Sequence, residues 1–122
     1  NYFKRKKRIL NFLKKDEYIA SSELIKLKTL KNEFIKYNLV YVDILKIDTE
    51  GFEFDIIRGA GDKLKLIKFI LFEHHYDQML VKNYKFSKIN QYLVELNFKK
   101  VVKLKMPLRK TFEYIYVNES LV

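Results

Sequence analysis

The chain has 122 residues, of which 48% are hydrophobic and 16% aromatic, and 25 Lys and Arg against 15 Asp and Glu give a formal net charge of +10. This length suits a single globular domain, and the aromatic content argues against an intrinsically disordered chain. Cys is absent, which excludes disulfides, thiolate zinc sites and a cysteine nucleophile, and no apolar run approaches the roughly 20 residues of a membrane-spanning helix. The sequence therefore predicts a cytoplasmic protein with no membrane span.

The first 24 residues are predicted to form a basic helical segment. Residues 2–15 carry seven cations, no acid and an incomplete apolar stripe at helical spacing, which favours a packed surface helix. An α/β core is expected over residues 25–122. It begins with a short half-buried strand over 25–29, where apolar residues alternate with Lys, and continues with a short helix ending near Asn38.

Two central strands are predicted in the middle of the chain. Val40–Asp48 is β-branched and mostly apolar, as expected of a strand covered on both faces. Gly51 is expected to open a helix that has Gly59 as its C-cap. A turn of helix then leads into the second strand, Lys68–His74.

The last third of the chain repeats the alternation of helix and strand. Ser87 is a candidate N-cap for a helix ending at Asn97. Phe98–Leu104 and Thr111–Asn118 are close enough in sequence to pair as an antiparallel hairpin. Two strands that each lead to a helix, followed by a closing hairpin, predict a mixed α/β sheet.

Polar residues gather where the two central strands end. Asp48 and Glu50 bracket the exit of the first strand, and Glu73, His74 and His75 close the second. In open α/β sheets, ligands bind beyond the carboxyl ends of parallel strands. If the two strands are neighbours, these side chains face one crevice and suit a general base or a divalent metal site.

Plainer interpretations exist for the strand-end residues. Asp48 and Glu50 also suit helix capping, because carboxylates near a helix N-terminus gain from its free N–H groups. Lys46 points into a buried sheet if alternation holds, as a paired structural cation or a substrate contact. A metal site made of Asp48, Glu50 and His74 is the weaker alternative, because no compact ligand motif supports it, and no metal ligand is assigned.

The second strand and the helix that follows Gly51 have plainer interpretations of the same kind. Glu73 and His74 are readily explained as structural hydrogen-bond partners, and His75 as an exposed side chain. Glu53 and Asp55 are expected on a solvated helix face.

The positive net charge makes nucleic acid a candidate ligand. Two basic blocks near the ends of the chain could neutralise phosphates, and the interleaved Tyr and Phe could stack on bases. However, 21 of the 25 cations are Lys and four are Arg, whereas base readout favours the guanidinium group. A non-catalytic basic binding or assembly module that contacts nucleic acid is therefore kept as the alternative function, and specific nucleic-acid binding is not favoured.

The glycines restrict cofactor binding. All three lie between residues 51 and 61, so the chain has neither a G-x-G-x-x-G turn nor a P-loop. The first residue is Asn rather than Met, which indicates a piece of a longer protein.

Residues 43–53 (DILKIDTEGFE), followed by residues 57–60 (IRGA), resemble the LKIDxEGxE…LxGA signature of FkbM-type methyltransferases. These S-adenosylmethionine-dependent enzymes have the Rossmann-like methyltransferase fold. The resemblance spans about residues 27–118 and includes the second strand and the closing hairpin. Lys31 stands where the family has an Asp, and the family's glycine-rich cofactor loop and acidic ribose-binding position are absent.

The resemblance implies the C-terminal half of a methyltransferase domain that lacks the N-terminal cofactor-binding strands and binds S-adenosylmethionine weakly or not at all. Such enzymes typically methylate a small-molecule or glycan hydroxyl, often on a sugar or secondary metabolite. The catalytic candidates are Asp48, Glu50 and His74, and the substrate-binding candidates are Lys46, Glu73 and His75. The cofactor-binding residues are expected upstream, and the Val40–Asp48 strand is expected to be an exposed edge able to pair with another chain.

Overall fold

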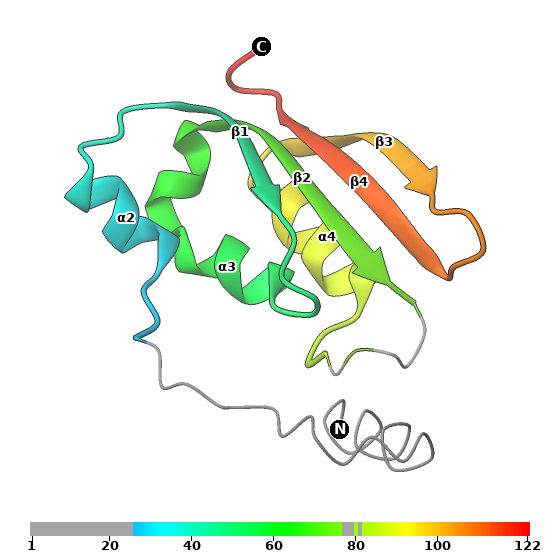
Figure 1. Ribbon diagram of the computed structural model, residues 1–122. Coiled ribbons are helices and arrows are strands. Elements are labelled where there is room, and N and C mark those ends of the chain that lie inside the picture. Colours follow the sequence, from blue (N-terminus) through cyan, green and yellow to red (C-terminus); the bar gives the residue numbers. More distant parts are fainter. Residues whose placement is uncertain (1–25, 77–79, 81) are drawn as a thin grey trace.

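The computed structural model describes residues 26–76, 80 and 82–122, and all structural statements below concern those residues. The predicted basic helix over residues 2–15 lies outside them. The elements in chain order are α2 (Leu30–Lys36), β1 (Val42–Ile47), α3 (Glu53–Gly59), the 3-10 helix η1 (Gly61–Leu66), β2 (Ile67–His75), α4 (Phe86–Glu95), β3 (Phe98–Lys105) and β4 (Thr111–Asn118) (Figure 1).

The strands form one four-stranded sheet in the order β1-β2-β4-β3. β1 and β2 run parallel, with Lys46 opposite Leu71 and Ile47 opposite Phe72, whereas β4 is antiparallel to both β2 and β3. The crossover between the parallel strands contains α3 and η1. The predicted mixed α/β sheet with a C-terminal hairpin is confirmed, and the carboxyl ends of β1 and β2 meet at one edge of the sheet.

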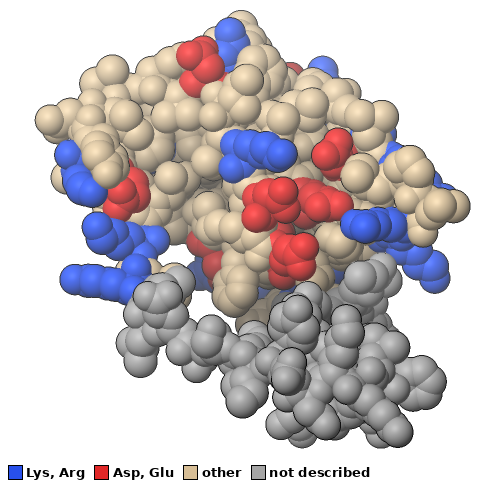
Figure 2. Space-filling view, in the orientation of Figure 1, with Lys and Arg blue, Asp and Glu red and all other residues tan. Residues whose placement is uncertain are grey.

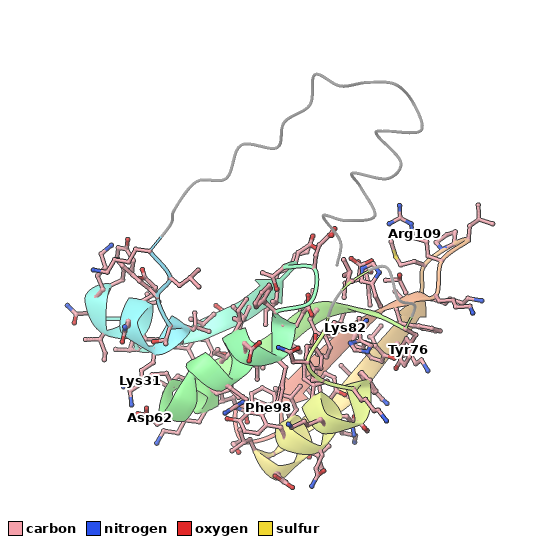
Figure 3. All side chains as sticks on the ribbon, turned by 90° about the horizontal axis from the view of Figure 1, so that it is seen from below. Lys31, Asp62, Tyr76, Lys82, Phe98 and Arg109 are labelled. Carbon is pink, nitrogen blue, oxygen red and sulfur yellow. The ribbon has the colours of Figure 1, made fainter. Side chains whose placement is uncertain are left out.

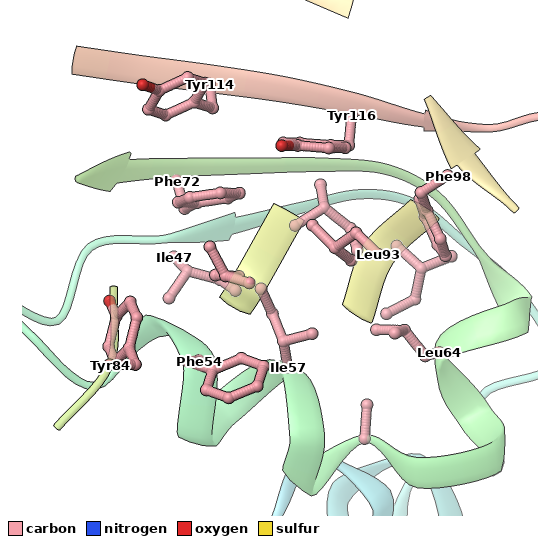
Figure 4. Close-up of a cluster of buried hydrophobic side chains, with 14 of the residues drawn as sticks. Ile47, Phe54, Ile57, Leu64, Phe72, Tyr84, Leu93, Phe98, Tyr114 and Tyr116 are labelled. Carbon is pink, nitrogen blue, oxygen red and sulfur yellow. The ribbon is translucent and has the colours of Figure 1, made fainter. Parts of the chain in front are cut away.

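Helices cover one face of this sheet. Phe72, Tyr114 and Tyr116 point from the strands toward α3 and α4 and are at most 2% exposed (Figure 4). Ile57 of α3 and Leu93 of α4 meet them from the helix layer and are fully buried. Burial of each such side chain contributes about 1.5–3 kcal/mol relative to exposure, so this layer carries the apolar core.

The other face of the sheet has no helix over it among the described residues. Ile44 of β1 and Leu104 of β3 remain 59% and 56% exposed on that side. β1 is also the edge strand, and Ile47 is its one buried residue. The prediction that the Val40–Asp48 strand is covered on both faces is therefore wrong, because the described chain supplies neither a strand beyond β1 nor a second helical layer.

The predicted strand over residues 25–29 is also wrong over its described part. Residues 26–29 have no regular structure, because no other strand lies beside them to pair with. Thr29 instead begins α2, since its hydroxyl accepts a hydrogen bond from Asn32 N at 3.2 Å, as an N-cap does.

Two predicted helix ends are displaced. α3 continues through Gly59 to the right-handed Ala60, and the positive φ of 54° falls on Gly61, because the chain turns there into η1. The N-cap of α4 is the extended Lys85, which places Ser87 inside the first turn. The existence of both helices is confirmed, the C-cap of α3 lies one residue after the predicted Gly59, and the N-cap of α4 lies two residues before the predicted Ser87.

Candidate functional site

The turn that follows β1 is fixed by a buried carboxylate. The backbone reverses at Glu50 and Gly51, which have φ values of 52° and 118°, and the second of these suits glycine. Glu53, at the start of α3, is 2% exposed and accepts hydrogen bonds from Gly51 N at 2.9 Å and Thr49 Oγ1 at 3.4 Å. The prediction of a solvated Glu53 is wrong, because its side chain bends back under the turn.

Tyr84 ties this turn to the segment that precedes α4. Its hydroxyl donates to Glu53 Oε2, and its ring lies 5.5 Å from that of Phe54. Burial raises the pKa of the Tyr84 phenol, and the bond to Glu53 adds to the shift, so the hydroxyl remains a proton donor. Two segments far apart in sequence therefore hold the Asp48–Gly51 turn in one conformation.

Some of the expected strand-end residues meet on the face of the sheet that no described helix covers. Lys46, Asp48 and Glu73 line a pocket of about 190 Å³ there, together with Glu113 of β4. Figure 2 shows acidic side chains gathered near the middle of the face that the strands present in Figure 1. Asp48 and Lys46 are exposed and thus open to a ligand. The structure brings the first strand's Asp48 to the second strand's Glu73, as the parallel pairing predicts.

Glu50 lies outside this pocket lining and is exposed on the turn itself. Within residues 26–76, 80 and 82–122, no three acidic or His side chains come close enough together to hold a metal ion. The structure therefore does not assemble Asp48, Glu50 and His74 as a ligand set.

His74 lies on the opposite face from Glu73, because neighbouring residues of a strand point to opposite sides. It is 3% exposed, and its ring packs 4.8 Å from Tyr76 and 5.5 Å from Phe86. Burial, with the nearby charges of Lys82 and His75, lowers the pKa of His74 to about 4, although Glu53 acts in the other direction. His74 is therefore neutral at pH 7, and its Nδ1 atom has no hydrogen-bond partner among the described residues.

His75 is buried rather than exposed. Its Nδ1 lies 3.0 Å from Thr111 Oγ1, and its Nε2 lies 3.7 Å from Glu73 Oε2. With 7% exposure, this ring joins the end of β2 to the start of β4. The prediction of a solvent-exposed His75 is wrong, because β4 runs directly beside this part of β2.

A second pocket, which the sequence reasoning missed, opens at the end of β2 and the start of α4. It has a volume of about 500 Å³ and lies on the same side of the sheet as His74. Figure 3 shows Tyr76 and Lys82 together at this end of the molecule, far from Lys31 and Asp62. The alternation of Lys with aromatic residues over 82–86 was the available signal. The aromatic and cationic residues that line this second pocket are Tyr76, Tyr84, Phe86, Lys82, Lys85 and Lys100.

Lys31, which lies upstream of the signature where the resemblance implies an Asp, has a structural role here. Its Nζ lies 2.6 Å from Asp62 Oδ1, and this bond lowers the pKa of Asp62. Both side chains are about half exposed, so the pair joins α2 to η1 at the surface.

The described fold is that of a Rossmann-like methyltransferase fragment, with an acidic turn at the carboxyl end of a parallel strand pair and a terminal hairpin. Residues 7–100 match the family model of the methyltransferase FkbM domain. The chain therefore belongs to the FkbM methyltransferase family. A search of curated proteins and a search of solved structures each find no match.

Methyltransferases generally use S-adenosylmethionine. Nucleotide-type cofactors are commonly held by a glycine-rich turn between a strand and a helix. The turn between β1 and α3 has one glycine and two accessible carboxylates instead. It suits a cationic or hydroxyl-bearing group, and it lacks the backbone cradle that a nucleoside needs. No described helix is long and apolar enough to cross a lipid bilayer.

Proposed function

We propose that this chain is the acceptor-side, C-terminal part of an S-adenosylmethionine-dependent O-methyltransferase that acts on a hydroxyl of a sugar or secondary metabolite. The observation that carries the proposal is the Asp48–Gly51 turn, which lies within the residues that match the family model and at the carboxyl ends of β1 and β2. Buried Glu53 holds this turn in place, which is the preorganisation that positioning of a reacting hydroxyl requires.

The bound cofactor supplies an electrophilic methyl group, and the acceptor hydroxyl loses its proton as it becomes an ether. In our proposal Asp48 receives that proton or orients the hydroxyl, because its carboxylate is exposed and lines the pocket on the uncovered sheet face. Glu50, on the same turn, shares this role. Lys46 and Glu73 hold other polar groups of the acceptor. His74 and His75 stay in the proposal as a catalytic and a substrate-binding candidate, and both line the second pocket at the end of β2.

The cofactor half of the site belongs upstream of this chain in the proposal. The restricted glycine positions support it, because no strand-to-helix turn of the chain has a glycine-rich cradle. The proposal also assigns a basic segment over residues 1–24 and an α/β core over 25–122. The proposal further includes pairing of the exposed β1 edge with another chain. It also includes a cytoplasmic location, which the absence of Cys supports.

The test compares the 122-residue chain with the product of the complete reading frame that contains it. We expect calorimetry to show no low-micromolar binding of S-adenosylmethionine to the chain alone. The complete product is expected to bind the cofactor and to transfer a tritium-labelled methyl group to a hydroxyl acceptor. Low-micromolar binding by the chain would overturn the assignment of the cofactor half. Salt-dependent binding of DNA or RNA without methyl transfer would overturn the enzyme assignment.

A further inference from the structure

The pocket at the start of α4 has the charge and shape of an anion site. Lys85 is the N-cap residue of the helix and Lys82 lies in the preceding segment, while Lys100 reaches the pocket from β3. No acidic side chain is among the described residues that line it. Among the described carboxylates, Glu53 accepts from the lining residue Tyr84, and Glu73 lies beside the lining residue His75.

The helix end adds donors to this positive surface. The first turn of an α-helix leaves backbone N–H groups without intrahelical partners. The Lys85 side chain makes no capping hydrogen bond, and the first turn of α4 contains no acidic residue that would compensate the dipole. Ser87, within that turn, places a hydroxyl at the pocket. Backbone amides, a hydroxyl and Lys side chains are the usual donors to a phosphate group.

An unsatisfied buried nitrogen independently marks this pocket. His74 lines it and is only 3% exposed, yet no described residue pairs with its Nδ1. Buried polar atoms are nearly always paired in folded proteins. The His74 ring packs against the Tyr76 and Phe86 rings that line the pocket, so a ligand seated there would lie close to this unpaired nitrogen.

Aromatic rings form the wall of the pocket behind these donors. The Phe86 and Tyr114 rings stack at 4.2 Å, and Lys100 Nζ lies 5.4 Å from the Phe86 centroid. Tyr76 is about half exposed, so its ring offers a surface on which the face of a sugar can pack. An anion alone does not need such a wall, whereas a phosphorylated sugar uses both the wall and the cations.

We infer that this pocket binds the phosphate group of a phosphorylated acceptor, such as a sugar phosphate, with Lys85, Lys100 and the first turn of α4 as its donors. The inference rests on the proposed function and names the substrate class. Tyr84 lines this pocket and also bonds Glu53, which holds the Asp48–Gly51 turn. Tyr84 thus links the pocket to the reacting turn through Glu53, and in this inference the acceptor extends between the two at the carboxyl end of β2, with its phosphate held at a distance from the hydroxyl to be methylated.

The test is a titration of the isotopically labelled 122-residue chain, followed by NMR, with glucose 6-phosphate, inorganic phosphate and glucose as probes. We expect saturable shifts of the amides at the start of α4 with the first two probes, tighter binding of the sugar phosphate, and no binding of glucose. Equal affinity for glucose 6-phosphate and inorganic phosphate would overturn the sugar-phosphate assignment. No saturable shift with either would overturn the anion site.

Charge-matched variants separate a built site from general attraction to a basic protein. The double substitution Lys85→Gln and Lys100→Gln is expected to weaken glucose 6-phosphate binding at least about tenfold, since it removes two charge-assisted donors. The control is Lys88→Gln with Lys99→Gln, which removes the same charge from the same two elements outside the pocket lining. We expect less than about a twofold change in the control. Equal weakening in both would refute the site.

Failure of this inference is distinguishable from failure of the proposed function. The titration needs no cofactor and no methyl transfer, so absent phosphate binding leaves the transfer assay as an independent test. If the complete product transfers no methyl group but phosphate binding is still saturable, the enzyme assignment is refuted and the anion-site assignment stands.

Discussion

Removal of the Glu53 carboxylate tests how the acidic turn is held. Glu53→Ala leaves Gly51 N and the Tyr84 hydroxyl without their acceptor, and both groups lie in buried surroundings. An unsatisfied buried donor costs about 1–3 kcal/mol, so with two such donors we expect the free energy of unfolding to fall by about 2–6 kcal/mol. The exposed Thr49 adds little, because water replaces its partner. Urea denaturation at pH 7 measures the change.

The matched control for Glu53 is Asp55, an exposed acid two residues further along α3. Asp55→Ala is expected to change stability by less than about 0.5 kcal/mol. Tyr84→Phe removes one donor to Glu53, and the double variant with Glu53→Ala is expected to lose about 1–2 kcal/mol less than the sum of the two single losses. Equal, small effects of Glu53→Ala and Asp55→Ala would refute the idea that this carboxylate holds the turn.

Two further predictions concern the core. The pKa of His74 falls from 6.5 to about 4 on folding, so the unfolded chain binds the proton more readily between those values, and His74 lowers stability as the pH falls from 7 toward 4. At pH 4.5 we expect this loss to be at most about 2–3 kcal/mol, and His74→Phe to reduce the pH dependence by that amount in urea denaturation. An unchanged pH dependence in His74→Phe would contradict it. Leu93→Ala, at a fully buried position of α4, is expected to cost about 2–5 kcal/mol by the same measurement, and a cost below about 1 kcal/mol would show that α4 does not pack on the sheet as described.

Local sequence patterns correctly predicted the strands that are rich in apolar residues. β2 and the closing hairpin follow their predicted ranges within one residue, because β-branched and aromatic runs bounded by turns have few other conformations. β1 begins two residues late, and the strand expected over 25–29 is absent from its described part. Alternation over a few residues makes a strand only where a neighbouring strand accepts its hydrogen bonds.

The candidate site was predicted in part. The parallel pairing of β1 and β2 follows from the strand–helix–strand order, and it brings Asp48 and Glu73 to one pocket. The sequence also allowed the prediction that Glu73 and His74 lie on opposite faces of the sheet, because successive strand residues point to opposite faces. The prediction that Glu73 and His74 face one crevice did not take this alternation into account.

The burial of Glu53 could not be predicted from local sequence. An acidic residue in the first turn of a helix is usually exposed and compensates the helix dipole, and Glu53 occupies such a position in α3. Tyr84, 31 residues away in the sequence, covers it and donates a hydrogen bond to its carboxylate, a contact that exists only in the folded chain. The second pocket likewise depends on tertiary contacts, since Lys100 of β3 meets Phe86 of α4 there.

The most direct test of the central claim is methyl transfer by the complete reading frame product with its acidic turn altered. Asp48→Asn and Glu50→Gln are expected to lower the transfer rate by about 10²-fold or more in combination, since general base catalysis contributes about 10²–10⁴-fold. The control is Asp43→Asn, an exposed acid at the other end of β1. Wild-type rates in the double variant, or equal losses in the control, would contradict the assignment of the Asp48–Gly51 turn as the reacting centre.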